Sequence, residues 1–123
     1  MVSLDKQLHA KSNGLRAAGA QAIGEMLKVN KTLTLLDLSD NEIGMWSEGS
    51  RARYNYKEHP TPEGPAALAD GLKANKSVQQ LDVSANGLGA DGGKAIATSI
   101  AENRTITSVK YLSVSRMRFY LLF

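Results

Sequence analysis

The residue types that carry most enzyme chemistry are scarce in this chain. Its 123 residues include no cysteine and only two histidines, His9 and His59. Without cysteine there is no thiolate nucleophile or metal ligand and no disulfide framework. The sequence also lacks the motifs of zinc proteases, serine hydrolases and P-loop proteins. It therefore predicts a non-catalytic protein that needs no metal or cofactor.

A glycine-rich stretch gives the one faint hint of phosphate binding. Gly87, Gly89, Gly92 and Gly93 follow an expected strand and precede an expected helix, as in a phosphate-binding loop. The same glycines recur at matching places elsewhere in the chain, which favours a structural role for them. The glycines that share the two recurring positions are Gly44 with Gly89, and Gly19 and Gly64 with Gly92.

Four charged or titratable residues occupy the equivalent position of four successive expected strands. They are His9, Asp37, Asp82 and Lys110, and neighbouring parallel strands would hold them side by side. Two adjacent carboxylates repel each other, and a possible cation at each end would offset that repulsion. The simplest interpretation is a solvated row of charges. The functional interpretation is an acidic spot that binds an Arg or Lys of a partner protein, because two carboxylates alone bind metals poorly.

An insertion concentrates residues of the kinds that dominate binding interfaces. Asn41 and Asn86 lie 45 residues apart, whereas Asn13 and Asn41 lie 28 apart, so one unit carries 17 extra residues. We expect this insertion, residues 45–61, to be an exposed, mobile loop that binds a partner. Toleration of a longer surface loop is the alternative, because lengthening costs little. The candidate contact residues are Trp46, Arg51, Arg53, Tyr54 and Tyr56.

These candidates are positioned by a recurring strand and turn. The stretch 33–44, LTLLDLSDNEIG, has the form L-x-x-L-x-L-x-x-N-x-I, and residues 78–88 repeat it. Alternate strand residues point inward, and the asparagine amide can bond its own turn and the next one. The sequence divides into repeats near 7–32, 33–77 and 78–105, a partial repeat at 106–111 and a tail at 112–123. The first repeat is degenerate.

Each turn leads into a helix. We expect helices near 16–29, 63–74 and 90–102, and strands near 8–10, 35–38, 80–83 and 108–111. The apolar face of the first helix is assigned to Ala18, Ala22, Ile23, Met26 and Leu27. Asn30 is expected to end that helix in a left-handed conformation. Thr61 is expected to cap the second helix with its hydroxyl group.

The pattern resembles the ribonuclease-inhibitor-like class of leucine-rich repeats over roughly residues 7–111. The segments that carry the resemblance are NGLRAAGAQAIGEMLKVNKTLTLLDLSDNEIG and ANGLGADGGKAIATSIAENRTITSV. The resemblance implies an α/β solenoid in one domain, with parallel strands on the concave side and helices on the convex side. It also implies protein–protein binding through the repeat surface. A regulatory fragment of the GTPase-activating or actin-capping kind is an alternative.

The charge distribution bears on the class of partner. The net charge is +3, but residues 1–109 hold as many basic as acidic residues, so the repeats are neutral. A basic face for nucleic acid is therefore not predicted, and single-strand binding through the insertion remains a lesser alternative. No secretory signal or membrane span is evident, and we expect a cytoplasmic or nuclear protein. The apolar tail, 112–123, is either a cap or a surface for self-association.

Overall fold

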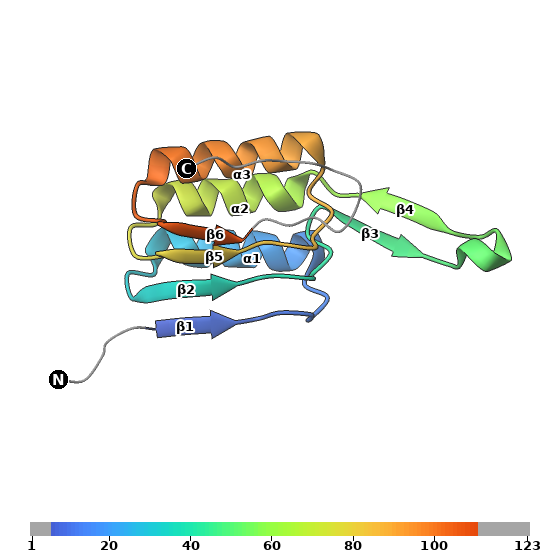
Figure 1. The fold of residues 1–123 in the computed structure, drawn as a ribbon, viewed down its shortest axis with the longest axis horizontal. Coiled ribbons are helices and arrows are strands. Elements are labelled where there is room, and N and C mark those ends of the chain that lie inside the picture. Colours follow the sequence, from blue (N-terminus) through green and yellow to red (C-terminus); the bar gives the residue numbers. More distant parts are fainter. Residues whose placement is uncertain (1–5, 111–123) are drawn as a thin grey trace.

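The computed structural model describes residues 6–110, and it contains one parallel sheet, three helices and a projecting hairpin (Figure 1). The sheet has the strand order β1-β2-β5-β6. Its strands are β1 (Lys6–His9), β2 (Leu33–Asp37), β5 (Gln80–Asp82) and β6 (Ser108–Lys110). The helices are α1 (Arg16–Val29), α2 (Glu63–Ala74) and α3 (Gly89–Asn103). The expected strands and helices are confirmed, with small shifts at their ends.

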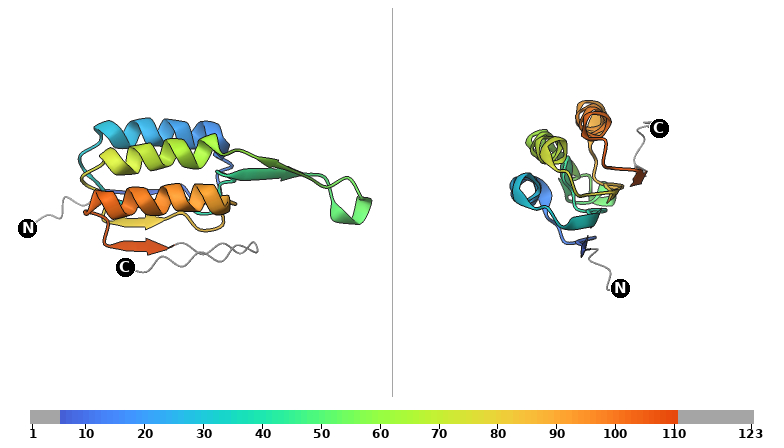
Figure 2. Two further views of the ribbon diagram at one scale, coloured as in Figure 1. Left: turned by 90° about the horizontal axis from the view of Figure 1, so that it is seen from above. Right: turned by 90° about the vertical axis from the view of Figure 1, so that its left-hand side faces the viewer.

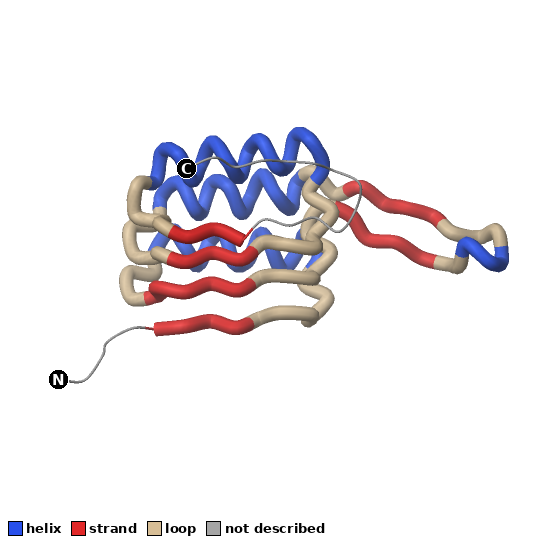
Figure 3. The backbone as a smooth tube through the Cα atoms, in the orientation of Figure 1, coloured by secondary structure: helices blue, strands red, loops and turns tan. Residues whose placement is uncertain are grey.

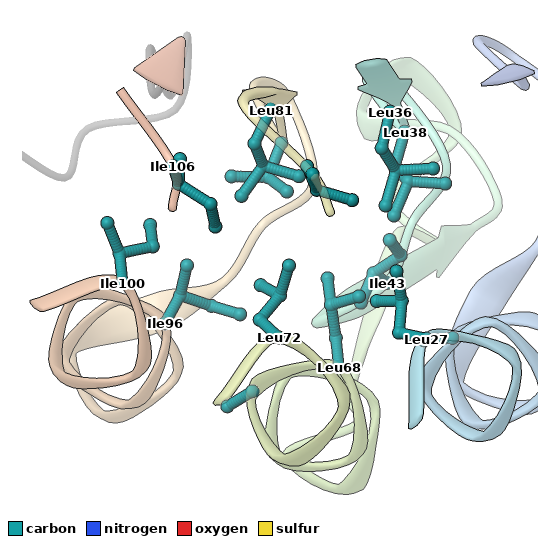
Figure 4. Packing of buried hydrophobic residues seen from close by; sticks show 14 of the residues in the cluster. Leu27, Leu36, Leu38, Ile43, Leu68, Leu72, Leu81, Ile96, Ile100 and Ile106 are labelled. Atoms are coloured by element: carbon teal, nitrogen blue, oxygen red, sulfur yellow. The ribbon is translucent and has the colours of Figure 1, made fainter. Parts of the chain in front are cut away.

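The three helices cover one face of the sheet and leave the other face open (Figures 2 and 3). Alternate strand residues account for this, because residues two apart in a strand point to the same side. Leu36 and Leu38 are fully buried against the helices, whereas Asp37 between them is only half-buried. Figure 4 shows the leucines and isoleucines of strands and helices meeting in a single layer.

A ladder of asparagine side chains ties the turns after the strands together. The Oδ1 of Asn86 accepts a hydrogen bond of 2.8 Å from the backbone N–H of Asn41. The Oδ1 of Asn41 accepts one of 2.8 Å from the N–H of Asn13 in the same way. These bonds confirm that the asparagines link consecutive repeats. The side-chain amides of Asn41 and Asn86 also donate to backbone carbonyl oxygens of their own turns.

A second asparagine ladder runs along the other end of the repeats, where the helices end. The Nδ2 of Asn75 donates to the carbonyl oxygens of Leu27 and Asn30, at 3.0 and 3.1 Å. Asn103 donates to the carbonyls of the second repeat in the same way. The expected left-handed conformation of Asn30 is wrong, since its φ is −75° and its ψ is 133°. An extended backbone there turns the side chain toward the next strand.

The start of α2 also differs from expectation. The hydroxyl group of Thr61 donates to the carbonyl oxygen of Ile43 at 2.9 Å, and no side chain caps the helix. Thr61 also donates its N–H to the carbonyl oxygen of Gly44. The threonine therefore closes the base of the insertion and does not cap the helix.

The buried face of α1 is rotated from the one that the sequence predicted. Ala18 and Ala22 are exposed, and Ile23 and Met26 are only half-buried, so the assignment of that stripe is partly wrong. The buried residues of α1 are Ala17, Ala20, Gly24 and Leu27. The rotation follows from the neighbouring helix, because α1 packs sideways on α2 as well as down on the sheet.

Close contact between α1 and α2 depends on two glycines that face each other. A Cβ atom on Gly71 would lie 2.5 Å from the carbonyl oxygen and 2.7 Å from the Cα of Gly24. A Cβ on Gly24 would in turn lie 2.4 Å from the carbonyl oxygen of Ala67. The obstructing atoms are backbone atoms, so relief requires moving one helix away from the other.

Gly71→Ala is therefore expected to destabilise the protein by about 1–3 kcal/mol through overpacking. The sign of the change in the free energy of unfolding decides the matter, because alanine in place of glycine ordinarily stabilises a helix interior by about 1 kcal/mol. Urea unfolding followed by circular dichroism measures the change. Ala66→Gly on the exposed side of the same helix is the control for helix propensity alone. A more stable Gly71→Ala protein would contradict the close helix contact.

Tyr111 and the tail 112–123 lie outside the described residues, as do residues 1–5. The cap and self-association hypotheses for the tail therefore stay predictions.

Candidate functional site

The four residues of the predicted charge row lie next to one another on the open face of the sheet. His9 pairs in register with Asp37, Asp37 with Asp82, and Asp82 with Lys110. The prediction that these positions are adjacent is confirmed. No ion pair joins any two of them within residues 6–110. The Nε2 of His9 instead lies 3.0 Å from the Oε1 of Gln7. We name this set of four residues the acidic row.

Each aspartate of the acidic row is fixed in place by the serine two residues later. The Oδ1 of Asp37 accepts hydrogen bonds from the N–H of Ser39 at 3.0 Å and from its hydroxyl at 2.7 Å. Asp82 and Ser84 repeat the arrangement, at 3.0 and 2.6 Å. One carboxylate oxygen is thus occupied by the protein in each case. The other is left for a donor that approaches the open face.

The surroundings of Asp37 favour its charged form. Burial alone would raise the pKa of Asp37, but the hydrogen bonds from Ser39 and the nearby charges of His9 and Lys11 outweigh it. The pKa of Asp37 is consequently lowered from its ordinary value. Asp37 is therefore a carboxylate at neutral pH.

The acidic row borders a pocket with a volume of about 170 Å³. Leu35 and Gln80 come from the adjacent position of the same strands, so the pocket combines carboxylates with an apolar wall. Liquid water takes about 30 Å³ per molecule, so the pocket has room for one extended side chain. Its full lining is His9, Leu35, Leu36, Asp37, Gln80, Leu81, Asp82, Ser108 and Lys110.

The insertion is a β-hairpin, whereas the sequence predicted a loop and no strands there. Strand β3 (Met45–Glu48) pairs antiparallel with β4 (Lys57–Pro60), and a 3-10 turn, η1 (Arg51–Arg53), lies between them. Figure 1 shows the hairpin extending away from the repeats at the end toward which β2 and β5 point. Residues that the sequence grouped as one patch are therefore spread along an arm.

The base of the hairpin is held by a stack of aromatic and charged groups. The Trp46 and His59 rings, which are cross-strand partners, lie 4.0 Å apart with an angle of 15° between their planes. The guanidinium of Arg16 lies 4.2 Å from the centre of the Trp46 ring, a cation–π contact. His59 also lies 2.9 Å from Glu48. Arg16 begins α1, so this stack joins the hairpin to the first repeat.

A second stack orders the outer half of the hairpin. The guanidinium of Arg51 lies 4.3 Å from the centre of the Tyr56 ring and 3.7 Å from a carboxylate oxygen of Glu58. The hydroxyl group of Tyr56 donates to that same oxygen at 3.1 Å. The N–H of Ser50 donates to the side chain of Asn55 at 2.7 Å across the turn. These contacts fix the residues on both sides of the turn.

Tyr54 and Arg53 form the exposed end of the arm, which we call the tip. Tyr54 is 98% exposed and has a left-handed backbone, with a φ of 56°. Arg53 is exposed and makes no ion pair within the described part of the chain. Of the five predicted contact residues of the insertion, only these two are free. Trp46, Arg51 and Tyr56 are engaged in holding the hairpin together.

Sequence reasoning missed several residues that shape these sites. Arg16 gave no signal, because nothing local links it to Trp46, which is 30 positions away. The serines carried a usable signal, since the string D-x-S occurs after both strands as Asp37–Ser39 and Asp82–Ser84. Leu35 also carried a usable signal, because it places an apolar residue at a position of β2 that alternates with the inward leucines and so lies on the open face.

Among residues 6–110, no group of three or more His, Asp or Glu side chains is placed to hold a metal ion. None of the helices in that part of the chain has the length and apolar character to cross a membrane. A nucleic-acid surface on the arm loses support, because Trp46 and Tyr56 already stack on side chains of the protein.

Comparison with known proteins addresses the repeats. The family model described as "Leucine Rich repeat" matches residues 29–44 and 74–97, which contain Asn41 and Asn86. A segment of 44 residues is 46% identical to leucine-rich repeat-containing protein 45 of Gallus gallus, covering 36% of this chain. The chain spans 7% of the length of that relative. Together with the repeated strand, asparagine turn and helix, these matches show that the chain contains leucine-rich repeats.

Proposed function

We propose that this protein is a non-catalytic binding module that captures a basic side chain of a partner protein in the pocket beside the acidic row. The observation that carries the proposal is the in-register pair of carboxylates, Asp37 and Asp82, at the edge of a pocket of about 170 Å³. Leucine-rich repeats suggest a protein-interaction role in general. The carboxylates of the acidic row would bind the basic side chain of the partner protein.

A guanidinium group suits this site better than a simple ammonium. It offers several N–H donors in a planar fork, and it can bond two carboxylates at once. Its aliphatic stem would pack on Leu35, which forms part of the pocket wall. The serine bonds hold both aspartates in position before the ligand arrives, so little side-chain freedom is lost on binding.

The hairpin supplies a second contact region in this proposal. It begins directly after Ile43 and Gly44, beyond the asparagine turn that follows β2, and it lengthens the surface on that side. A partner seated on the acidic row and long enough to pass the ends of the strands would meet the arm. The stacks at its base and outer half keep the arm ordered in the absence of that partner.

A fluorescent tetra-arginine peptide tests the acidic row directly, with fluorescence anisotropy as the measurement. We expect binding at low ionic strength that weakens by about tenfold in the double variant Asp37→Asn/Asp82→Asn. Asparagine keeps an oxygen to accept the serine bonds, so the turns remain intact. Alanine would remove those bonds too and would confuse binding with folding.

The control is Asp70→Asn, which removes an exposed carboxylate from α2 on the opposite side of the molecule. It should leave the peptide affinity unchanged. Equal loss in the control and in the double variant would mean that the peptide responds only to net charge. Unchanged affinity in the double variant would exclude the acidic row as the binding site.

A further inference from the structure

We propose that the partner seated on the acidic row is a second copy of this chain, which inserts the tip of its hairpin arm. The proposal rests on the proposed function, because it names the ligand of the same pocket. The occupant would be Arg53, with Tyr54 packed beside it. Each copy carries one tip and one pocket.

The two surfaces are complementary in charge. The pocket holds two carboxylates, with Lys110 at one end of the row and His9 at the other. The charged groups of the arm are Arg51, Arg53, Lys57, Glu48 and Glu58. Two of them offset each other within the arm, since Arg51 pairs with Glu58. Arg53 stands at the far end, where it approaches an acidic surface first.

The surfaces are also complementary in chemistry beyond charge. Tyr54 is a large side chain with 98% exposure, and such a residue gains much by burial at an interface. Leu35, which is half-buried on the open face, gives the pocket an apolar wall against which a ring can pack. The row thus matches a tip that presents one cation and one aromatic ring together.

The tip is rigid enough to act as a ligand. The hydroxyl oxygen of Ser50 accepts from the N–H of Ala52 at 3.2 Å, and the N–H of Tyr54 donates to the carbonyl oxygen of Arg51. A Cβ on Gly49 would lie 2.1 Å from the carbonyl oxygen of Asn55, so the two sides of the turn touch. A preformed tip loses little conformational entropy on binding.

The geometry makes this contact intermolecular. Figures 1 and 2 show the arm extending beyond the repeats, with its tip away from the open face of its own sheet. The arm cannot fold back, because the stack of Arg16, Trp46 and His59 fixes its base. The same projection presents the tip to the open face of another molecule. The contact is head-to-tail, so it builds chains or closed rings.

Analytical ultracentrifugation of the full chain over a range of concentrations tests the proposal. We expect self-association that weakens as salt rises, because the contact pairs opposite charges. The tip variant is Arg53→Ala/Tyr54→Asn, in which asparagine tolerates the left-handed backbone. The pocket variant is Asp37→Asn/Asp82→Asn. Each variant alone should associate about tenfold more weakly or remain monomeric.

Mixing the two variants gives the sharpest result. The tip variant keeps an intact pocket and the pocket variant keeps an intact tip, so an equimolar mixture should form heterodimers. Growth should stop there, because the remaining tip and pocket are both disabled. Lys57→Ala is the matched control, since it removes one positive charge from the shaft of the same arm and should associate like the unmodified chain.

Three outcomes would overturn the proposal. The first is a strictly monomeric unmodified chain at about 1 mM, far above the concentrations at which specific complexes form. The second is association of either variant as strong as that of the unmodified chain, and the third is a mixture without heterodimers. Association through residues 112–123 would produce the second of these. Binding of the tetra-arginine peptide distinguishes failure of the self-association proposal from failure of the proposed function. The peptide should bind the tip variant as tightly as the unmodified chain, whatever the result of the mixing experiment.

Discussion

Asn86→Ala is expected to lower the free energy of unfolding by about 3–5 kcal/mol, because it breaks a buried network and leaves backbone groups without partners. The side chain of Asn86 is 2% exposed. Its Oδ1 accepts from the N–H groups of Asn41 and Ile43, at 2.8 and 3.4 Å. Its Nδ2 donates to the carbonyl oxygens of Leu38, Val83 and Ser84. Urea unfolding followed by circular dichroism gives the measurement.

The first repeat supplies a matched control for this prediction. Asn13 occupies the same position in the repeat, but it is exposed, and its Nδ2 donates only to Ala10 and Lys11 of its own turn. Asn13→Ala is therefore expected to cost about 1 kcal/mol or less. Similar losses in the two variants would show that the ladder between repeats contributes little and that only the local turn matters.

The repeats were predictable because their residues act over short and regular distances. Leu36 and Leu38 point toward the helices whenever their segment is a strand, and the asparagine that follows can bond only nearby backbone. The same argument applied to β5, and it placed Asp37 beside Asp82 before the structure did. A parallel sheet of equal repeats keeps equivalent positions adjacent, so residues at the same position of successive repeats lie side by side in the structure.

The hairpin was not predictable from its own residues. Neither MWSE nor KEHP alternates between apolar and polar residues, and the turn lacks the Asn-Gly or Asp-Gly signal of tight hairpins. An isolated two-stranded hairpin is at best marginally stable. This one is held by Arg16, which belongs to α1 and is remote in sequence. The local sequence therefore understated how much of the insertion is ordered.

The helix ends show how one residue type supports two different structures. Asparagine is common at a left-handed helix end, which led to the expectation for Asn30. In the structure Asn30 is extended and its Oδ1 accepts from Leu33 at 2.8 Å, while Arg104 takes the left-handed conformation after α3. The carbonyl oxygen of the extended Asn30 also accepts a hydrogen bond from the Nδ2 of Asn75 in the next repeat, so its backbone takes part in the ladder between repeats.

Leu81→Ala is expected to cost about 2–5 kcal/mol, the sum of lost burial and the cavity that remains. Leu81 is 2% exposed and points from β5 toward the helices, where Leu72 and Ile96 close the layer (Figure 4). Leu8 occupies the register position of Leu81 two strands away in β1, and it is only half-buried at the edge of the sheet. Leu8→Ala, measured by the same urea unfolding, should therefore cost less than half as much. Because both variants remove the same atoms from the same position of the repeat, their difference measures the packing supplied by flanking repeats. A loss of well under about 1 kcal/mol for Leu81→Ala would mean that β5 is not packed as a central strand.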